Sequence, residues 1–214
     1  MNKDDRPLHE QIADHMYHSR TDPKLEYLIE KYGDEFVATE YGSILSTRFP
    51  NFYVYLVWSE EEQTYKDDYI VYLHKENLKN IVSSIASPIF GQFKLFVDSY
   101  GVSPSHLGKN STAEELLNLG SEDKPIVQIH IFTAKAPEQK EEDMRSFAES
   151  IQEQGYSVSV TIEYLSEENF NMVNADNYGN DKMLHENFYK YVGSAIITPE
   201  NFKWRFDGWE VGKG

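Results

Sequence analysis

The chain contains no cysteine among its 214 residues. This absence excludes disulfide bonds, thiolate zinc sites and cysteine nucleophiles. It does not choose a compartment, because exported proteins can also fold without disulfide bonds. No apolar run approaches the length needed to span a bilayer, so we expect no direct membrane insertion. The opening residues Met1 to Glu10 are polar and unlike the core of a signal peptide. We therefore expect either a cytosolic protein or the mature part of an exported one, and we favour the extracellular or cell-surface location.

The sequence also lacks the short motifs of well-known enzyme classes. It has no Gly-x-Ser-x-Gly elbow, phosphate-binding glycine loop, dinucleotide fingerprint or His-Glu-x-x-His helix. These absences disfavour a familiar hydrolase, kinase, dehydrogenase or zinc protease. We predict no catalytic residue and no cofactor from the sequence, although an enzyme with scattered catalytic residues is still compatible with it.

Basic residues are few compared with acidic ones. Lys and Arg number 20 against 36 Asp and Glu, which gives a net charge of −16. Such a field repels phosphates, so nucleic acid is excluded as an expected partner, and a basic protein or a cation is favoured. An acidic surface also keeps a protein soluble, and we expect a monomer or a weak dimer.

Two segments share the order strand, helix, strand, namely Phe52–Val97 and Ile126–Leu165. This order predicts an α+β fold in which a mixed or antiparallel sheet is flanked by helices. The two segments have little residue identity, so convergence on a common unit explains them as well as duplication does.

The first segment opens with an aromatic and β-branched run at residues 52–58, which predicts a buried or half-buried strand. Apolar residues at helical spacing predict one helix over residues 66–86, ended by Pro88 and Gly91. The next strand is expected at residues 93–97. We expect this segment to be the better buried of the two.

The second segment repeats the order with clearer signals. Residues 126–131 predict a strand, and apolar residues on one helical face predict a helix around residues 144–151. Residues 158–164 alternate between apolar and polar, so we expect one face of this strand to contact solvent or a partner.

The domain organisation follows from the polar stretches. Residues 1–22 predict a flexible N-terminal arm, and residues 23–214 a single α+β body. The Gly, Pro and Ser content of the loop at residues 101–110 marks a boundary between sub-halves 23–110 and 111–214.

Helix-capping signals fix several element ends. Asp22 is expected as an N-cap before Pro23, and Gly33 ends that helix. Ser111 and Glu114 have the spacing of a capping box.

Three short segments carry a family resemblance: Lys31-Tyr32-Gly33-Asp34-Glu35-Phe36, Asp67-Asp68-Tyr69 and Gly91-Gln92-Phe93-Lys94. Through them the chain resembles uncharacterised secreted or lipid-anchored proteins of Gram-positive bacteria. It covers most of residues 23–165 in element order. It implies an exported α+β domain and supplies no catalytic residues.

Metal binding is not expected. His15 and His18 lie one helical turn apart, near Asp14 and His9, but an arm without apolar anchoring does not hold ligands in place. We therefore interpret these histidines as solvated.

The loop Asn174–Gly179 has a glycine in the sixth place of a calcium loop. However, Tyr178 stands where the fifth ligand belongs, and His185 stands at the twelfth place, which requires a glutamate. An EF-hand is rejected, and a weak surface cation site at Asp176 and Asp181 is the remaining alternative.

The strand 126–131 carries His130, whose side chain points opposite to its apolar neighbours. We interpret it as a structural histidine, because a general base would need a carboxylate and a nucleophile nearby. Glu163 and Glu168 are a candidate carboxylate pair for hydrolysis, although an acidic chain forms such pairs by chance.

Aromatic residues are frequent, with 15 Tyr and 12 Phe. Core packing is the favoured role for those that alternate in strands, such as Tyr53 and Tyr55, although aromatic residues also form protein- or carbohydrate-binding faces. The residues that we predict to bind a partner lie in the second half: Trp204, Trp209, Tyr164 and Glu163.

Three functions are compatible with these patterns. The leading hypothesis is a non-enzymatic, exported bacterial domain that acts by protein binding. The alternatives are an acidic immunity-type protein that neutralises a basic toxin, and a hydrolase with an unfamiliar site.

Overall fold

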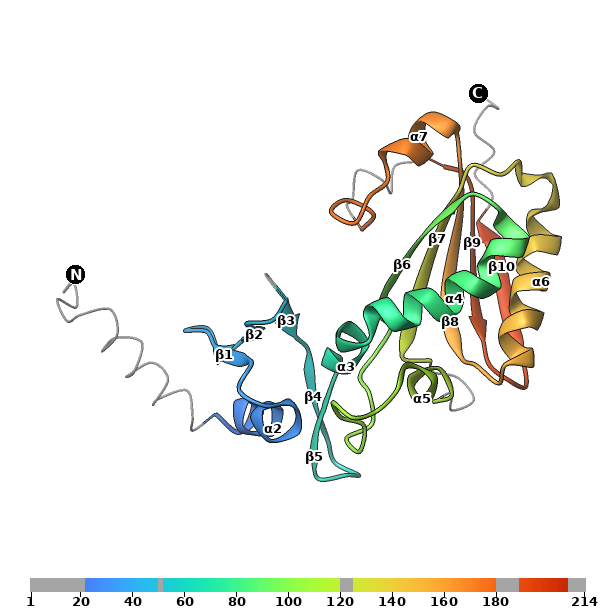
Figure 1. Ribbon diagram of the computed structural model, residues 1–214. Coiled ribbons are helices and arrows are strands. Elements are labelled where there is room, and N and C mark those ends of the chain that lie inside the picture. The colour runs from blue at the N-terminus through green and yellow to red at the C-terminus, as the bar shows by residue number, and fades with distance from the viewer. Residues whose placement is uncertain (1–21, 50–51, 120–124, 180–188, 208–214) are drawn as a thin grey trace, which may run out of the picture. The chain divides into compact units, whose positions relative to one another are not determined.

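The computed structural model describes residues 22–49, 52–119, 125–179 and 189–207 (Figure 1). The chain divides into two compact units: unit 1 is Met1–Ile70 with Val102–Asn110, and unit 2 is Val71–Gly101 with Ser111–Gly214. The boundary differs from the expected sub-halves, because residues 71–101 belong with the second unit. Apart from Asp22, the expected N-terminal arm lies outside the described residues.

Unit 1 begins with helix α2 (Pro23–Tyr32), whose ends follow the sequence prediction. The Asp22 side chain accepts a hydrogen bond from the Lys24 N–H at 2.9 Å, and the helix stops at Gly33, which adopts a φ of 104°. A three-stranded antiparallel sheet follows in the order β1-β2-β3, and a hairpin pairs β4 with β5. The strand bounds are β1 Phe36–Ala38, β2 Ile44–Ser46, β3 Tyr53–Val54, β4 Leu56–Ser59 and β5 Thr64–Asp67.

The core of unit 1 is built around the buried ring of Tyr69, at the start of the short helix α3 (Tyr69–Leu73). The rings of Tyr32 and Phe36 meet it edge-on, with centroids 5.0 and 4.8 Å away. The rings of Phe49 and Phe52 are tilted against it, with centroids 5.6 and 6.1 Å away. Edge-to-face packing of this kind adds about 0.5–1.5 kcal/mol per pair beyond burial alone.

Unit 2 contains one five-stranded sheet in the order β10-β9-β8-β7-β6. Only β7 and β8 are parallel within it, and helix α6 connects them. The bounds in this unit are α4 Lys75–Phe90, β6 Phe93–Ser99, α5 Ala113–Leu117, β7 Val127–Thr133, the 3-10 helix η1 Pro137–Gln139, α6 Lys140–Glu153, β8 Val158–Leu165, α7 Glu167–Met172, β9 Tyr189–Ile197 and β10 Phe202–Asp207.

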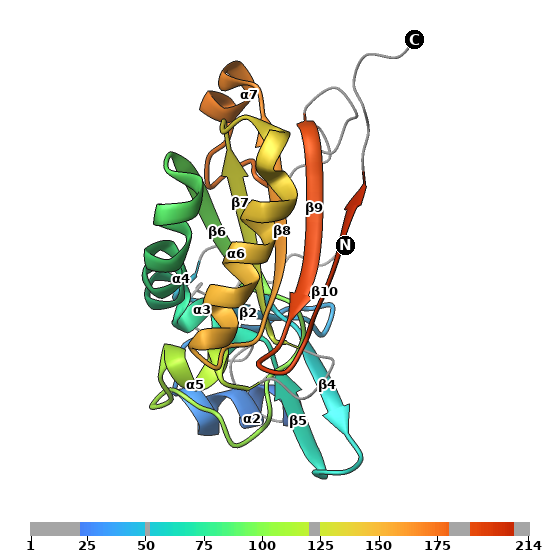
Figure 2. The same ribbon diagram turned by 90° about the vertical axis from the view of Figure 1, so that its right-hand side faces the viewer.

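The two faces of this sheet differ. Helices α4 and α6 cover one face (Figure 2). On that face, alternate strand residues such as Ile131 and Ile162 are fully buried. The other face, which we call the second face, has a small apolar cluster of Phe132, Leu165, Phe170 and Val173 where α7 follows β8. Elsewhere the second face carries polar residues such as Gln128, Ser159 and Thr161, together with apolar residues such as Ile196. The α+β class with a mixed sheet is therefore confirmed.

Several local predictions were wrong. Residues 66–86 do not form one helix: β5 ends at Asp67, α3 covers Tyr69–Leu73, and α4 starts after His74. Pro88 does not end α4, because the helix continues to Phe90, whose ring packs on Phe147 at 6.1 Å. Pro88 lies in the last turn, where it removes a single backbone hydrogen bond. Gly91 caps the helix end as expected, with a φ of 64°.

The two strand-helix-strand segments are not equivalent in the structure. In the second, β7 and β8 pair with each other, whereas in the first β4 and β6 belong to different sheets. The capping box also lies one residue later than predicted, with Thr112 and Glu115 as partners. Strand β9 begins at Tyr189. None of the described helices is both long and apolar enough to cross a membrane.

Candidate binding surface

The segment Tyr53–Trp58 carries three exposed aromatic side chains, and we call it the aromatic segment. It spans β3 and β4 of unit 1. Tyr53 is 58% exposed, Tyr55 61% and Trp58 44%, while Val57 is also exposed. The strand predicted at residues 52–58 is divided into β3 and β4, and it is half-buried rather than buried, since Val54 is buried between the exposed Tyr53 and Tyr55. Large apolar side chains that gather on a surface mark interaction sites more often than singly exposed ones do.

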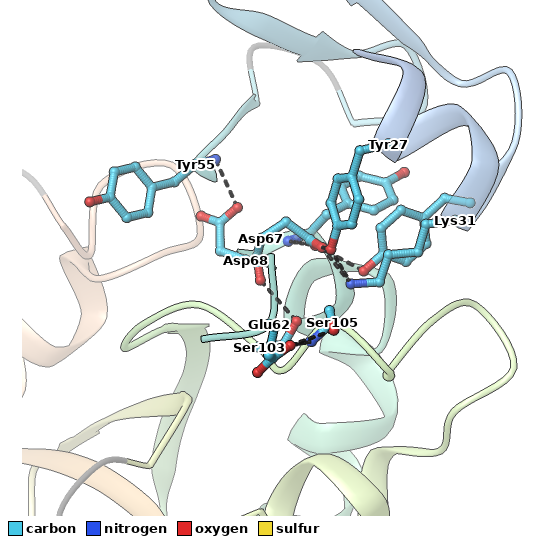
Figure 3. Close-up of polar contacts among 10 residues, drawn as sticks. Tyr27, Lys31, Tyr55, Glu62, Asp67, Asp68, Ser103 and Ser105 are labelled. Carbon is cyan, nitrogen blue, oxygen red and sulfur yellow. Dashed lines mark hydrogen bonds and ion pairs between the residues drawn. The ribbon is translucent and has the colours of Figure 1, made fainter. Parts of the chain in front are cut away.

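Asp68 holds Tyr55 in this position. The Tyr55 N–H donates to Asp68 Oδ1 at 2.9 Å, and the Asp68 N–H donates to the Tyr55 carbonyl at 3.3 Å. Both backbone groups of Tyr55 are thus satisfied at the break between β3 and β4. In Figure 3 the Tyr55 ring extends away from Asp68 and from the cluster around Asp67.

The neighbouring carboxylate, Asp67, is fully buried and points the other way, toward helix α2 (Figure 3). Its Oδ2 accepts hydrogen bonds from the Tyr27 hydroxyl at 2.8 Å and from Lys31 Nζ at 2.7 Å. Its Oδ1 accepts from the Tyr32 hydroxyl at 2.8 Å and from the Tyr69 N–H at 3.0 Å. A buried charge is tolerated only when it is paired and hydrogen-bonded. Here Lys31 pairs with the Asp67 carboxylate, and both carboxylate oxygens accept hydrogen bonds.

The electrostatics of this cluster follow from burial. Desolvation lowers the pKa of Lys31, although Asp67 opposes the shift. Burial, followed by the Asp67 charge, raises the pKa of Tyr27 and of Tyr32, so both hydroxyls stay protonated as donors. Desolvation also raises the pKa of Asp68 to about 7. The cluster therefore joins α2 to Asp67 at the end of β5. The next residue is Asp68, whose carboxyl accepts the hydrogen bond from Tyr55.

The loop at residues 102–110 completes the support. The N–H and the hydroxyl of Ser103 donate to the Asp67 carbonyl at 2.7 and 2.9 Å. The Ser105 hydroxyl hydrogen-bonds to Glu62 in the β4–β5 turn. Lys66 lies 2.6 Å from Glu62, and the hydrogen bonds from Lys66 and Ser105 lower the Glu62 pKa to about 2. The hairpin that follows the aromatic segment is thus fixed at its turn and at its base.

The charge beside the aromatic segment is negative. Glu60, Glu61 and Glu62 form the turn directly after β4, and all three are exposed. Gln63 closes the turn at a φ of 51°, with its amide donating to the Glu60 carbonyl at 2.7 Å. An aromatic surface with an acidic edge favours a partner of opposite charge.

Tyr164 and Glu163, predicted to bind a partner, lie in the central strand β8, where both are buried. The Tyr164 hydroxyl donates to Asp143 Oδ2 at 3.0 Å, and Lys135 Nζ pairs with Asp143 Oδ1 at 2.6 Å. The expectation that one face of this strand is exposed was wrong, because only Thr161 is partly exposed along β8.

Glu163 is 7% exposed on the second face, and burial raises its pKa to about 8. Its proposed carboxylate partner Glu168 is exposed on α7. Trp204 lies in β10 and lines a pocket on the second face. Trp209 lies outside the described residues.

His130 meets a carboxylate that sequence spacing could not identify. Its Nε2 lies 3.7 Å from Asp98 Oδ2, and the Tyr178 hydroxyl donates to Asp98 Oδ1 at 2.7 Å. Lys75 Nζ lies 3.4 Å from Asp98 Oδ1. Burial lowers the pKa of His130, although Asp98 opposes the shift. Among the described residues no hydroxyl hydrogen-bonds to the imidazole, so the nucleophile–base pair of a hydrolase is not formed there.

Metal binding finds no support in the described part of the chain, where no three His, Asp or Glu residues gather at coordinating distance. His9, Asp14, His15, His18, Asp181 and His185 lie outside the described residues. Tyr178, in the loop that was compared with an EF-hand, stacks on Phe96 with centroids 4.2 Å apart.

Sequence reasoning missed Asp67 and Asp68 as supporting residues. The pair appeared only as part of a family resemblance, since two adjacent carboxylates are common in an acidic chain. Their roles depend on contacts with residues far away in the sequence. Asp67 accepts a hydrogen bond from Tyr27, 40 positions away, and Asp68 accepts one from Tyr55, 13 positions away.

Comparison with known proteins adds a distant likeness. No protein-family model matches the chain, and no curated protein matches it. Among solved structures, a DUF5037 family protein from Ruminococcus gnavus is similar at 15% sequence identity with a TM-score of 0.46. The match covers 92% of this chain and 100% of that chain. Its source is a Gram-positive bacterium, but a likeness of this level does not assign a function, and secretion and a lipid anchor stay predictions.

Proposed function

We propose that this protein is an exported bacterial domain that acts by binding a basic partner protein through the aromatic segment Tyr53–Trp58. The observation that carries the proposal is the exposure of Tyr53, Tyr55 and Trp58. The hydrogen-bonded carboxyls of Asp67 and Asp68 support the segment that holds them. Its resemblance to secreted proteins of Gram-positive bacteria supports the export.

The residue types suit the centre of a protein interface. Tyr and Trp are enriched among the residues that contribute most to binding, because their large rigid rings lose little entropy on contact. Each aromatic side chain buries about 150–250 Å² when fully covered. The half-exposed rings of the segment thus offer on the order of 300 Å² in total, compared with about 800 Å² per partner in a standard interface.

The charge selects the partner. The segment ends at the exposed glutamates of the β4–β5 turn, and the whole chain carries a net charge of −16. Complementary charge raises association rates and rejects acidic competitors. A basic toxin neutralised by an immunity-type protein is one form of such a partner.

The test is an affinity measurement with matched variants. The tagged protein captures partners from the culture medium and the cell-surface fraction of its own organism. Each captured protein is identified, purified and titrated, because capture alone is not support. Tyr53→Ser and Tyr55→Ser together should weaken binding at least tenfold, as loss of interface aromatics does.

Two controls make the result specific. Tyr41→Ser removes another exposed tyrosine and should leave the affinity unchanged. Glu60→Gln with Glu61→Gln should slow association at low salt and have a smaller effect at high salt. A partner that is acidic, or one that binds the Tyr53 and Tyr55 variant as tightly as the parent protein, would contradict the proposal.

A further inference from the structure

The second face of the sheet in unit 2 contains a pocket of about 430 Å³. The strand register places its lining residues in two rows across the sheet. One row joins Gln128, Ser159, Ile196 and Lys203, and the other joins Thr161, Ser194 and Arg205. Tyr100, Ala195 and Trp204 also line the pocket. This volume is within the range of about 300–1,000 Å³ that is typical of small-molecule sites.

The charge of the lining is opposite to that of the chain. Asp and Glu outnumber Lys and Arg by 36 to 20, yet among the described residues the lining includes Lys203 and Arg205 and no carboxylate. These two cations are separated by one residue on β10, so they project from the same face about 7 Å apart. Two cations at this spacing can contact one anionic group together, and a guanidinium is suited to carboxylate and phosphate oxygens.

Hydroxyl groups lie next to the cations. Gln128 Nε2 donates to Thr161 Oγ1 at 3.3 Å, and Arg205 Nε donates to Ser194 Oγ at 3.4 Å. Each hydroxyl oxygen accepts in these contacts, and its own proton can donate to a ligand oxygen. The Ser159 side chain lies in the same row as Gln128 and is buried. The pocket therefore offers hydrogen-bond donors beside its positive end.

We infer that this pocket binds a small anionic ligand, namely a phosphate or carboxylate group carried on a hydroxylated carbon skeleton. Lys203 and Arg205 contact the anionic oxygens, and Thr161 and Ser194 hydrogen-bond to the neighbouring hydroxyls. The site is separate from the aromatic segment of unit 1, so it does not rest on the proposed partner binding, and either can fail without the other.

Titration calorimetry with the full chain at low salt tests this inference. The probes are glucose 6-phosphate, gluconate, inorganic phosphate and glucose. We expect at least one of the two hydroxylated anions to bind at least tenfold more tightly than glucose, with an affinity that falls as salt is added. Binding of the sugar phosphate alone identifies a phosphate ester, and binding of gluconate alone identifies a carboxylate.

Variants then locate the site. Lys203→Gln with Arg205→Gln should weaken binding at least tenfold, whereas Lys79→Gln with Arg145→Gln makes the same charge change on helices α4 and α6 and should leave it unchanged. Thr161→Val with Ser194→Ala should reduce the affinity for the hydroxylated anion toward that of inorganic phosphate. Thermal unfolding checks that each variant is folded.

Three results would overturn the inference. The first is the absence of anion binding above the level of glucose. The second is an equal loss of affinity in the β10 variant and in the helix variant. The third is an unchanged preference for hydroxylated anions in the Thr161 and Ser194 variant, which would show that these two hydroxyls do not bind the ligand.

Discussion

Replacing Asp67 with asparagine should destabilise unit 1 strongly. The substitution keeps the size of the side chain but removes its charge. The oxygen that it replaces accepts hydrogen bonds from Tyr27 and Lys31 at 2.8 and 2.7 Å, and an amide nitrogen cannot accept either bond. The ammonium of Lys31, only 8% exposed, then has lost its carboxylate partner.

The expected loss follows from that uncompensated charge. Removing one partner of a buried ion pair costs about 3–5 kcal/mol. In a unit of this size, 1 kcal/mol shifts the melting temperature by about 4–8 °C, so a decrease of roughly 10 °C or more is expected. Lys31→Met in the Asp67→Asn background removes the buried ammonium and should restore a large part of the loss.

Urea unfolding followed by Trp58 fluorescence measures this effect in unit 1. Trp58 packs on Tyr65 with ring centroids 5.1 Å apart, and Tyr65 contacts Tyr27 of the cluster. Trp204→Phe and Trp209→Phe in the parent protein make Trp58 the sole tryptophan, since the chain has three. A change below about 1 kcal/mol, or no recovery with Lys31→Met, would refute the argument that Asp67 and Lys31 form a buried pair that organises unit 1.

Two further predictions concern the pH dependence of stability. The pKa of Asp68 is raised to about 7, so the folded state binds a proton that the unfolded state releases near pH 4, and stability falls as the pH rises between these values. Asp68→Asn should therefore stabilise unit 1 at pH 8 by up to about 4 kcal/mol and have no such benefit below pH 4, as measured by urea unfolding. The same reasoning applies to Glu163, whose pKa is raised to about 8 by burial. Glu163→Gln should therefore stabilise unit 2 at pH 9 by up to about 5 kcal/mol, as measured by urea unfolding followed by Trp204 fluorescence. Equal stability of variant and parent at pH 9 would contradict the raised pKa.

Local signals in the sequence predicted the elements whose ends depend on near neighbours. Asp22, Pro23 and Gly33 fixed the ends of α2, because a cap bonds to residues two to four positions away. The alternation of residues 158–164 correctly predicted β8. It did not predict that most residues on both faces of β8 are buried, with α7 packed against the second face at the Leu165 end.

The candidate sites depend on contacts that no spacing rule describes. Tyr53 and Tyr55 lie in an aromatic and β-branched run that is typical of a core strand. They are exposed because this run forms the short β3 and part of the two-stranded β4–β5 hairpin. His130 could be recognised as a polar side chain on an apolar strand. Its approach to Asp98 was not predictable, because the antiparallel pairing of β6 with β7 brings the two residues together from 32 positions apart.

The proposed function requires direct contact between the aromatic segment and a basic partner. A photo-crosslinking amino acid, benzoylphenylalanine, placed at Tyr55 reports that contact directly, and the same probe at Tyr41 in the β1–β2 turn is the control. We predict one cross-linked species with a basic partner from the position of Tyr55, competed away by unlabelled parent protein but not by its Tyr53→Ser and Tyr55→Ser variant. Equal cross-linking from both positions, or competition by that variant, would contradict the account.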